Sequence, residues 1–108
     1  MEPTPITLTE FMIRCGTVRH RPKIVCMDGF KMSVQGNEMA YSIPRKTGPQ
    51  FSAMEIGFPS EPEDLIITYA DNPADPTGTV YGYIPMKLIE QVVLKHGGIN
   101  ADVTFEDF

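Results

Sequence analysis

Apolar residues recur at helical spacing near the start of the chain, and signals for a helix start and stop surround them. Thr7 and Glu10 have the three-residue separation of a capping box, in which each side chain bonds the backbone N–H of the other. Gly16 is suited to end the helix, because glycine adopts a positive φ without strain. The pattern predicts a helix over residues 8–15 whose buried face holds Leu8, Phe11, Met12 and Cys15.

A second helical run follows Pro85, a residue favoured at the first helical position. Lys95 and His96 suit the negative C-terminal end of this helix, and Gly97-Gly98 ends it. We therefore predict a helix over residues 85–96 with an apolar stripe of Leu88, Ile89, Val92 and Val93.

Between these helices the period changes to two. Residues 23–27 are mostly apolar, and residues 30–35 alternate between apolar and polar side chains, which is typical of strands with one buried face. Asp28-Gly29 between them is a strong hairpin signal. Gly36-Asn37 predicts a second tight turn, so residues 39–43 are expected to form the third strand of an antiparallel meander.

Three more strands are predicted, separated by acidic and proline-rich loops. They cover residues 51–58, with Met54, Ile56 and Phe58 on one face, residues 65–69 and residues 79–84. The elements together predict an α+β fold: a twisted antiparallel sheet of five or six strands, a short N-terminal helix, and one C-terminal helix packed on the sheet.

A chain of 108 residues is the size of one domain, and we expect a single domain over residues 1–108. Residues 1–6 are expected to be flexible. Residues 100–108 form an acidic tail, for which a strand, a docked segment and a mobile end all stay open.

Composition limits the classes of function. The net charge of −5 argues against non-specific nucleic-acid binding, because that affinity comes from neutralised phosphates. The chain has no long apolar run and no basic, apolar leader, so we expect no membrane span, no signal peptide and a cytoplasmic location. Cys15 and Cys26 are then expected to be reduced core residues.

The side chains with metal-binding or nucleophilic chemistry are Cys15, His20, Cys26 and His96. They lack the close ligand pairs of structural zinc sites, so we predict no metal and no cofactor. A cysteine nucleophile needs a base within reach, and His20 or His96 could serve Cys26, but no motif requires this. We predict that the chain is not an enzyme, with a small cysteine-dependent enzyme as the alternative.

A basic loop, Arg45-Lys46-Thr47-Gly48, offers two cations, a hydroxyl and backbone amides to an anion. Tyr41 precedes the loop and could stack on a base, and Arg19 and Arg21 could bind phosphate from a basic connector. The predicted nucleotide ligands are therefore Arg45, Lys46, Tyr41, Arg19 and Arg21. The alternative is a set of ordinary solvated loops.

Two tyrosines alternate with apolar residues near the end of the predicted sheet. If Val80 and Ile84 face the core, Tyr81 and Tyr83 face solvent, and exposed paired tyrosines are typical of a protein interface. The alternative is that another segment covers them. Glu61, Glu63 and Asp64 form an acidic loop that could join the interface or mimic a nucleic-acid backbone, with a solubilising surface as the alternative.

Several segments carry a resemblance to a known group. They are residues 26–35 (Cys-Met-Asp-Gly-Phe-Lys-Met-Ser-Val-Gln), Tyr41, Pro44-Arg45, residues 55–60 (Glu-Ile-Gly-Phe-Pro-Ser), residues 80–85 (Val-Tyr-Gly-Tyr-Ile-Pro) and His96-Gly97-Gly98-Ile99. In these segments the chain resembles small proteins of unknown function encoded by bacteriophages and prophages. The likeness covers about residues 7–99 and carries over no catalytic residue. It implies an accessory protein, rather than a virion part, in the cytoplasm of the infected bacterium.

Three hypotheses follow. The first is a non-enzymatic anti-defence or host-modulating protein that binds and blocks a host bacterial protein. The second is a sponge that sequesters a small nucleotide signal at the interfaces of a homo-oligomer. The third is an acidic mimic of nucleic acid.

Overall fold

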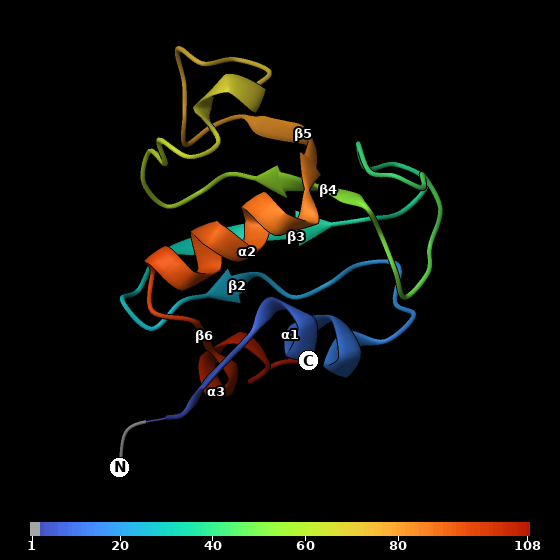
Figure 1. Cartoon of the computed structure of the whole chain (residues 1–108), viewed down its shortest axis with the longest axis vertical. Coiled ribbons are helices and arrows are strands. Elements are labelled where there is room, and N and C mark those ends of the chain that lie inside the picture. Colours follow the sequence, from blue (N-terminus) through green and yellow to red (C-terminus); the bar gives the residue numbers. More distant parts are fainter. Residues whose placement is uncertain (1–2) are drawn as a thin grey trace.

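The computed structural model describes residues 3–108 and shows two antiparallel sheets (Figure 1). The larger sheet has the strand order β2 (Ile24–Val25), β3 (Lys31–Gln35), β4 (Ala53–Gly57) and β5 (Val80–Pro85). The smaller sheet pairs β1 (Pro5–Ile6) with β6 (Ile99–Asn100). The predicted α+β class and the antiparallel arrangement are confirmed.

The helix α1 spans Leu8–Cys15, as the sequence predicted. Its capping box is complete, because the Glu10 N–H donates to Thr7 Oγ1 at 3.1 Å and the Thr7 N–H donates to Glu10 Oε1 at 2.9 Å. The helix α2 spans Met86–Lys95 and lies across one face of the four-stranded sheet (Figure 1). Both helices bury their apolar faces in a shared core.

The hairpin predicted at Asp28-Gly29 is confirmed. The Cys26 N–H donates to the Phe30 carbonyl at 2.8 Å, and Gly29 adopts a φ of 93°. Only glycine takes that φ without strain. The buried face predicted for residues 30–35 is confirmed, because Phe30, Met32 and Val34 are buried. Gln35 on the opposite face is buried as well, since its side chain exchanges hydrogen bonds with the Arg21 backbone.

The predicted third strand is wrong. Residues 39–43 form bends, with one isolated bridge between Ile43 and Ala53, and β3 pairs with β4 instead. The predicted strand over residues 65–69 is also wrong, because this segment holds a short 3₁₀ helix, η1 (Ile67–Tyr69). The main sheet therefore has four strands rather than five or six.

The first strand of the chain lies beside the segment that follows α2. The strand β1 pairs Pro5 with Asn100 and Ile6 with Ile99, a pairing that the expectation of a flexible segment over residues 1–6 did not include. Residues 1 and 2 lie outside the described residues. The acidic tail folds into α3 (Ala101–Thr104), whose Asn100 cap accepts from the Val103 N–H, and it docks beside β2 through a bond from the Val25 N–H to Thr104 Oγ1.

Within residues 3–108, no helix is long and apolar enough to cross a membrane.

Candidate functional site

The segment after β3 turns its large side chains outward. Met39, Tyr41 and Ile43 are 73%, 43% and 51% exposed, while Ala40 and Ser42 between them are buried. The period-two pattern of a strand is present, but the small side chains face the protein and the large apolar ones face water. Burial of apolar area is the main favourable term in folding, so an outward row of this kind favours a contact beyond the chain itself.

The backbone of this segment is already hydrogen-bonded. The N–H groups of residues 39–43 donate within the chain; that of Tyr41, for example, donates to the Glu55 carboxylate and that of Ile43 to the Ala53 carbonyl. A partner strand would therefore find no free N–H groups in residues 39–43 to pair with. The side chains, rather than the backbone, are what this segment offers to a partner.

Tyr83 completes the surface, and its backbone is unusual. Its φ is +55°, a left-handed conformation that is rare for a bulky side chain, and its side chain is 45% exposed. The Tyr83 N–H donates to the Tyr41 carbonyl at 2.9 Å, and the two rings tilt toward each other with centroids 5.8 Å apart. Non-glycine residues in this conformation cluster at functional sites, where the surrounding structure holds the strain.

The prediction that Tyr81 faces solvent is wrong. Tyr81 is fully buried, and its hydroxyl donates to the Pro76 carbonyl at 2.6 Å. The reason is a β-bulge: β4 pairs Met54 with Ile84 and Ile56 with Tyr81, so β5 has one residue more than β4 between the same two pairs. The alternation breaks there, so Tyr81 and Ile84 both face the core.

Sequence reasoning could have found this bulge from Gly82. A glycine inside a strand pattern often marks a bulge or a close approach of another segment. Both occur here, because a Cβ on Gly82 would lie 3.1 Å from the Tyr41 Cβ.

Arg45 joins the two tyrosines. Its guanidinium lies 5.3 Å from the centre of the Tyr41 ring, and its Nε donates to the Ala40 carbonyl at 3.1 Å. We call the surface formed by Met39, Tyr41, Ile43, Arg45 and Tyr83 the aromatic face. A hollow of about 360 Å³ adjoins it, lined by Tyr41, Tyr69, Ala70, Asp71, Val80, Gly82 and Tyr83. Tyr41 and Arg45 from the predicted nucleotide ligands therefore meet Tyr83 from the predicted interface.

The other predicted anion ligands differ in exposure and in partners. Arg19 and Lys46 are exposed, and Arg19 forms an ion pair with Glu38, whose Oε1 lies 3.3 Å from the Arg19 Nε. Arg21 is 1% exposed, so the prediction that it binds an external phosphate is wrong. Its guanidinium instead donates to the carbonyls of Gly16, Gly36 and Gly48.

The residues of the acidic loop differ in exposure. Glu61 and Asp64 are exposed as predicted, but Glu63 is 1% exposed and the prediction that it lies in an interface is wrong. Its carboxylate accepts from Lys95 Nζ at 2.8 Å and lies 2.6 Å from His96 Nε2. The opposite ring nitrogen, His96 Nδ1, lies 2.6 Å from the Asp28 carboxylate. Sequence spacing gave no sign of this cluster, because its members come from three distant segments.

The cysteines are buried and inert. Both Cys15 and Cys26 are free thiols in the core, and burial raises the pKa of Cys26 to about 12. A thiolate is the nucleophilic form, so neither cysteine is suited to attack a substrate near neutral pH. Among residues 3–108, no group of three or more His, Cys, Asp or Glu side chains could hold a metal ion.

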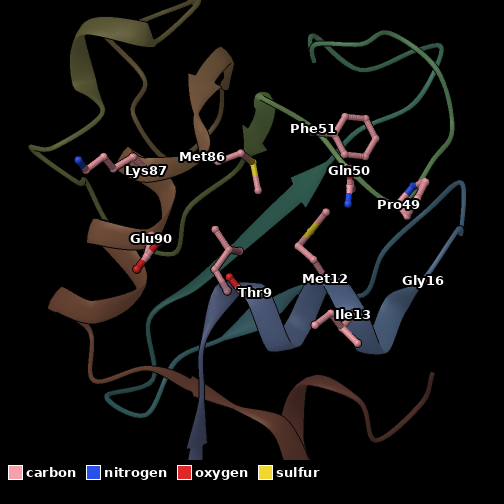
Figure 2. A pocket seen from close by; sticks show the side chains of 11 residues that line it. Thr9, Met12, Ile13, Gly16, Pro49, Gln50, Phe51, Met86, Lys87 and Glu90 are labelled. Atoms are coloured by element: carbon pink, nitrogen blue, oxygen red, sulfur yellow. The ribbon is translucent and has the colours of Figure 1, made fainter.

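A separate groove of about 630 Å³ lies between α1, the start of α2 and the segment before β4 (Figure 2). Met12, Phe51 and Met86 point toward its interior, and Lys87 and Glu90 stand at its edge on α2 (Figure 2). Ile13 beside it is 74% exposed. The groove has no counterpart among the residues predicted to be functional.

Comparison of the chain with models of protein families, with curated proteins and with solved structures gives no match.

A substitution at Tyr83 tests whether this residue serves the fold or the surface. We expect Tyr83→Gly to keep the free energy of unfolding within about 1 kcal/mol of the unsubstituted protein, because relief of the left-handed strain offsets the lost ring contact. Urea unfolding monitored by circular dichroism measures this. A loss of more than about 2 kcal/mol would show that Tyr83 is part of the folding core.

Proposed function

We propose that this chain is a non-enzymatic binding protein that attaches to a partner protein through the aromatic face and blocks it. The observation that carries the proposal is the inverted row at residues 39–43, in which large apolar side chains face water and small ones face the core. The resemblance to phage and prophage accessory proteins makes a host bacterial protein the expected partner, and an anti-defence or host-modulating role the expected purpose.

The composition of the aromatic face supports this proposal. Tyrosine and arginine are enriched among the residues that dominate binding energy at protein interfaces. Here Tyr41, Tyr83 and Arg45 pack on one another, so they lose little conformational freedom on binding. The strained backbone of Tyr83 is maintained although its side chain is only half covered, which fits a side chain held ready for a partner.

Capture of a nucleotide is the second candidate. The approach of Arg45 to the Tyr41 ring favours it, since the pair could hold a phosphate and stack on a base. Two of the five predicted ligands weaken it, because Arg21 is buried and Arg19 is paired with Glu38. The mimic of nucleic acid loses support in the same way, since Glu63 is buried in its ion pairs.

The test is capture from bacterial lysate with matched variants. We expect Tyr41→Ser and Tyr83→Gly each to reduce the affinity for the captured partner at least about tenfold, as substitutions at interface hot spots do. Ile13→Ser is the matched control, since Ile13 is as exposed as Met39 but lies beside the groove on α1. The captured protein should also lose its own activity when the unsubstituted chain is added.

Other outcomes point elsewhere. Loss of capture with Ile13→Ser alone would move the binding site to the groove between α1 and α2. An oligomer that releases a nucleotide on denaturation, detected by light scattering and mass spectrometry, would favour the sponge. A lysate that returns only the bait would count against the proposal.

A further inference from the structure

The basic loop holds one carboxylate of its own chain. Glu38 Oε2 accepts from both the N–H and the hydroxyl of Thr47, the latter at 2.7 Å, and Glu38 Oε1 lies 3.3 Å from the Arg19 Nε. Hydrogen bonds from Thr47 hold the pKa of Glu38 below its usual value. The loop therefore already binds a carboxylate, with the amide and the hydroxyl of Thr47 as donors and the Arg19 guanidinium as its ion-pair partner.

Positive charge in this loop exceeds what Glu38 neutralises. Arg45 donates to the carbonyls of Ala40 and Glu38, and it forms no ion pair with a carboxylate in residues 3–108. Lys46 is exposed and forms no hydrogen bond or ion pair with any residue in the same range. The cations of this site are Arg19, Arg45 and Lys46, and its acids are Glu38 and Glu55, whose carboxylate accepts from the Tyr41 N–H. The local charge is positive although the whole chain carries −5.

This basic site adjoins the aromatic face. Met39 follows Glu38 directly, and Arg45 lies over the Tyr41 ring. A hollow of about 260 Å³ shares Met39 with the aromatic face and Arg19 with the basic site, and His20 and Asn37 complete its lining. A partner that covers Met39 and Tyr41 would therefore place its neighbouring residues on Arg19, Arg45 and Lys46.

We propose that this site receives a carboxylate from an acidic segment of the partner protein, and that Glu38 occupies the same donors in the free protein. The identity of the occupant as part of the partner rests on the proposed function, whereas the carboxylate site itself does not. We infer a carboxylate as the ligand because these donors already hold the carboxylate of Glu38. We infer that a partner carboxylate can replace Glu38 because the ion pair is open to solvent: the side chains of Arg19 and Glu38 are 66% and 50% exposed.

An exposed site of this kind adds orientation and association rate more than affinity. The chain is acidic overall, so an acidic partner would be repelled at long range. A local basic site beside the apolar contact attracts the acidic group of the partner at short range. It therefore favours partners that carry an acidic group at the matching position.

Titration of the free protein tests the site without any partner. The probe is an acetylated triglutamate peptide, followed by the NMR shift of the Thr47 amide at constant ionic strength. We expect the peptide to shift this amide, and Glu38→Gln to bind the peptide roughly threefold more tightly than the unsubstituted protein, because the internal competitor loses its negative charge. Glu61→Gln is the matched control, since it removes the same charge from a distant exposed position.

A second variant keeps Glu38 and its hydrogen bonds in place. Lys46→Gln should weaken peptide binding by roughly threefold while the Thr47 amide of the free protein keeps its shift. The proposal is overturned if Thr47 does not respond in any variant, or if Glu61→Gln strengthens binding as much as Glu38→Gln. It is also overturned if inorganic phosphate shifts the amide and the peptide does not, because the site would then take phosphate.

Failure here and failure of the proposed function are distinguishable. If the Thr47 amide does not shift with the peptide, the proposed capture through Tyr41 and Tyr83 is not affected. A failed capture would leave the carboxylate site in place with no partner assigned.

Discussion

Replacing Arg21 with alanine is expected to lower the free energy of unfolding by about 3–5 kcal/mol, in the range for loss of a large buried side chain together with its hydrogen bonds. Arg21 is 1% exposed and is the largest fully buried side chain in residues 3–108. Its two terminal nitrogens donate to the carbonyls of Gly36, Gly16 and Gly48, and its planar group lies 5.2 Å from the centre of the Phe51 ring.

The expected loss has two sources. Alanine would leave three carbonyl groups without their donor and a cavity where the guanidinium packed. The three carbonyls belong to loops far apart in sequence, so the loops should also lose their mutual placement. Arg21→Lys should recover little, because an ammonium group cannot span three acceptors as the planar fork does.

Urea unfolding measures the effect, with Arg19→Ala as the matched control. Arg19 is exposed, and its loss should cost less than about 1 kcal/mol. Equal effects of the two substitutions would contradict the structural role assigned to Arg21.

The second large effect is expected at His96. His96→Ala should lower the free energy of unfolding by about 3 kcal/mol, because it removes a buried ring that stacks on Phe30 at 4.0 Å and leaves the buried Glu63 carboxylate short of one partner. His20→Ala, at an exposed loop position, is the control and should change stability by less than about 0.5 kcal/mol.

This cluster also predicts a window of pH. Although burial opposes its charge, the carboxylates of Glu63 and Asp28 raise the pKa of His96 above 6.5. Its contribution is therefore complete below the unfolded value near pH 6.5 and is lost as the pH rises through the folded pKa. Burial opposes ionisation of both acids. Hydrogen bonds from Lys95, Leu65 and His96 nevertheless lower the pKa of Glu63 below 4.5. Hydrogen bonds from Phe30 and His96 likewise lower the pKa of Asp28 below 3.8.

The carboxylates contribute fully above their unfolded values and lose this contribution as the pH falls through their folded pKa values. Both parts are present between about pH 4.5 and 6.5, so the cluster should stabilise the fold most in that interval. Unfolding by urea at several pH values measures the profile. If His96→Ala has the same dependence on pH as the unsubstituted protein, the cluster is not its source.

The aromatic face and the carboxylate site depend on interactions that the sequence did not reveal. Tyr41, Arg45 and Lys46 were predicted as ligands because two cations in one loop suit an anion and a neighbouring tyrosine could stack on a base. Glu38 was not, because a single acid next to a turn has no distinguishing pattern. Its importance comes only from its contact with Thr47 and Arg19.

Two of the errors about exposure, at Tyr81 and Glu63, come from rules applied to each segment alone. Tyr81 and Glu63 were placed at the surface because tyrosines alternated with apolar residues and because acids usually face water. An extra residue in β5 turned Tyr81 inward, and Lys95 with His96 made burial of Glu63 acceptable. The cause lies within the strand itself for Tyr81 and in a segment distant along the chain for Glu63.

The sequence by itself determined the local elements. The helices over residues 8–15 and 86–95 and the hairpin at Asp28-Gly29 depend on caps, turn residues and apolar spacing within a few positions, and these signals need no distant partner. Tertiary structure decided which strands pair, which polar side chains are buried and which apolar ones stay outside. Residues 39–43 have the alternation of a strand, but β4 takes the place beside β3, and the large side chains are left facing water. Pairing is a competition among segments far apart in sequence, so no local pattern fixes its outcome.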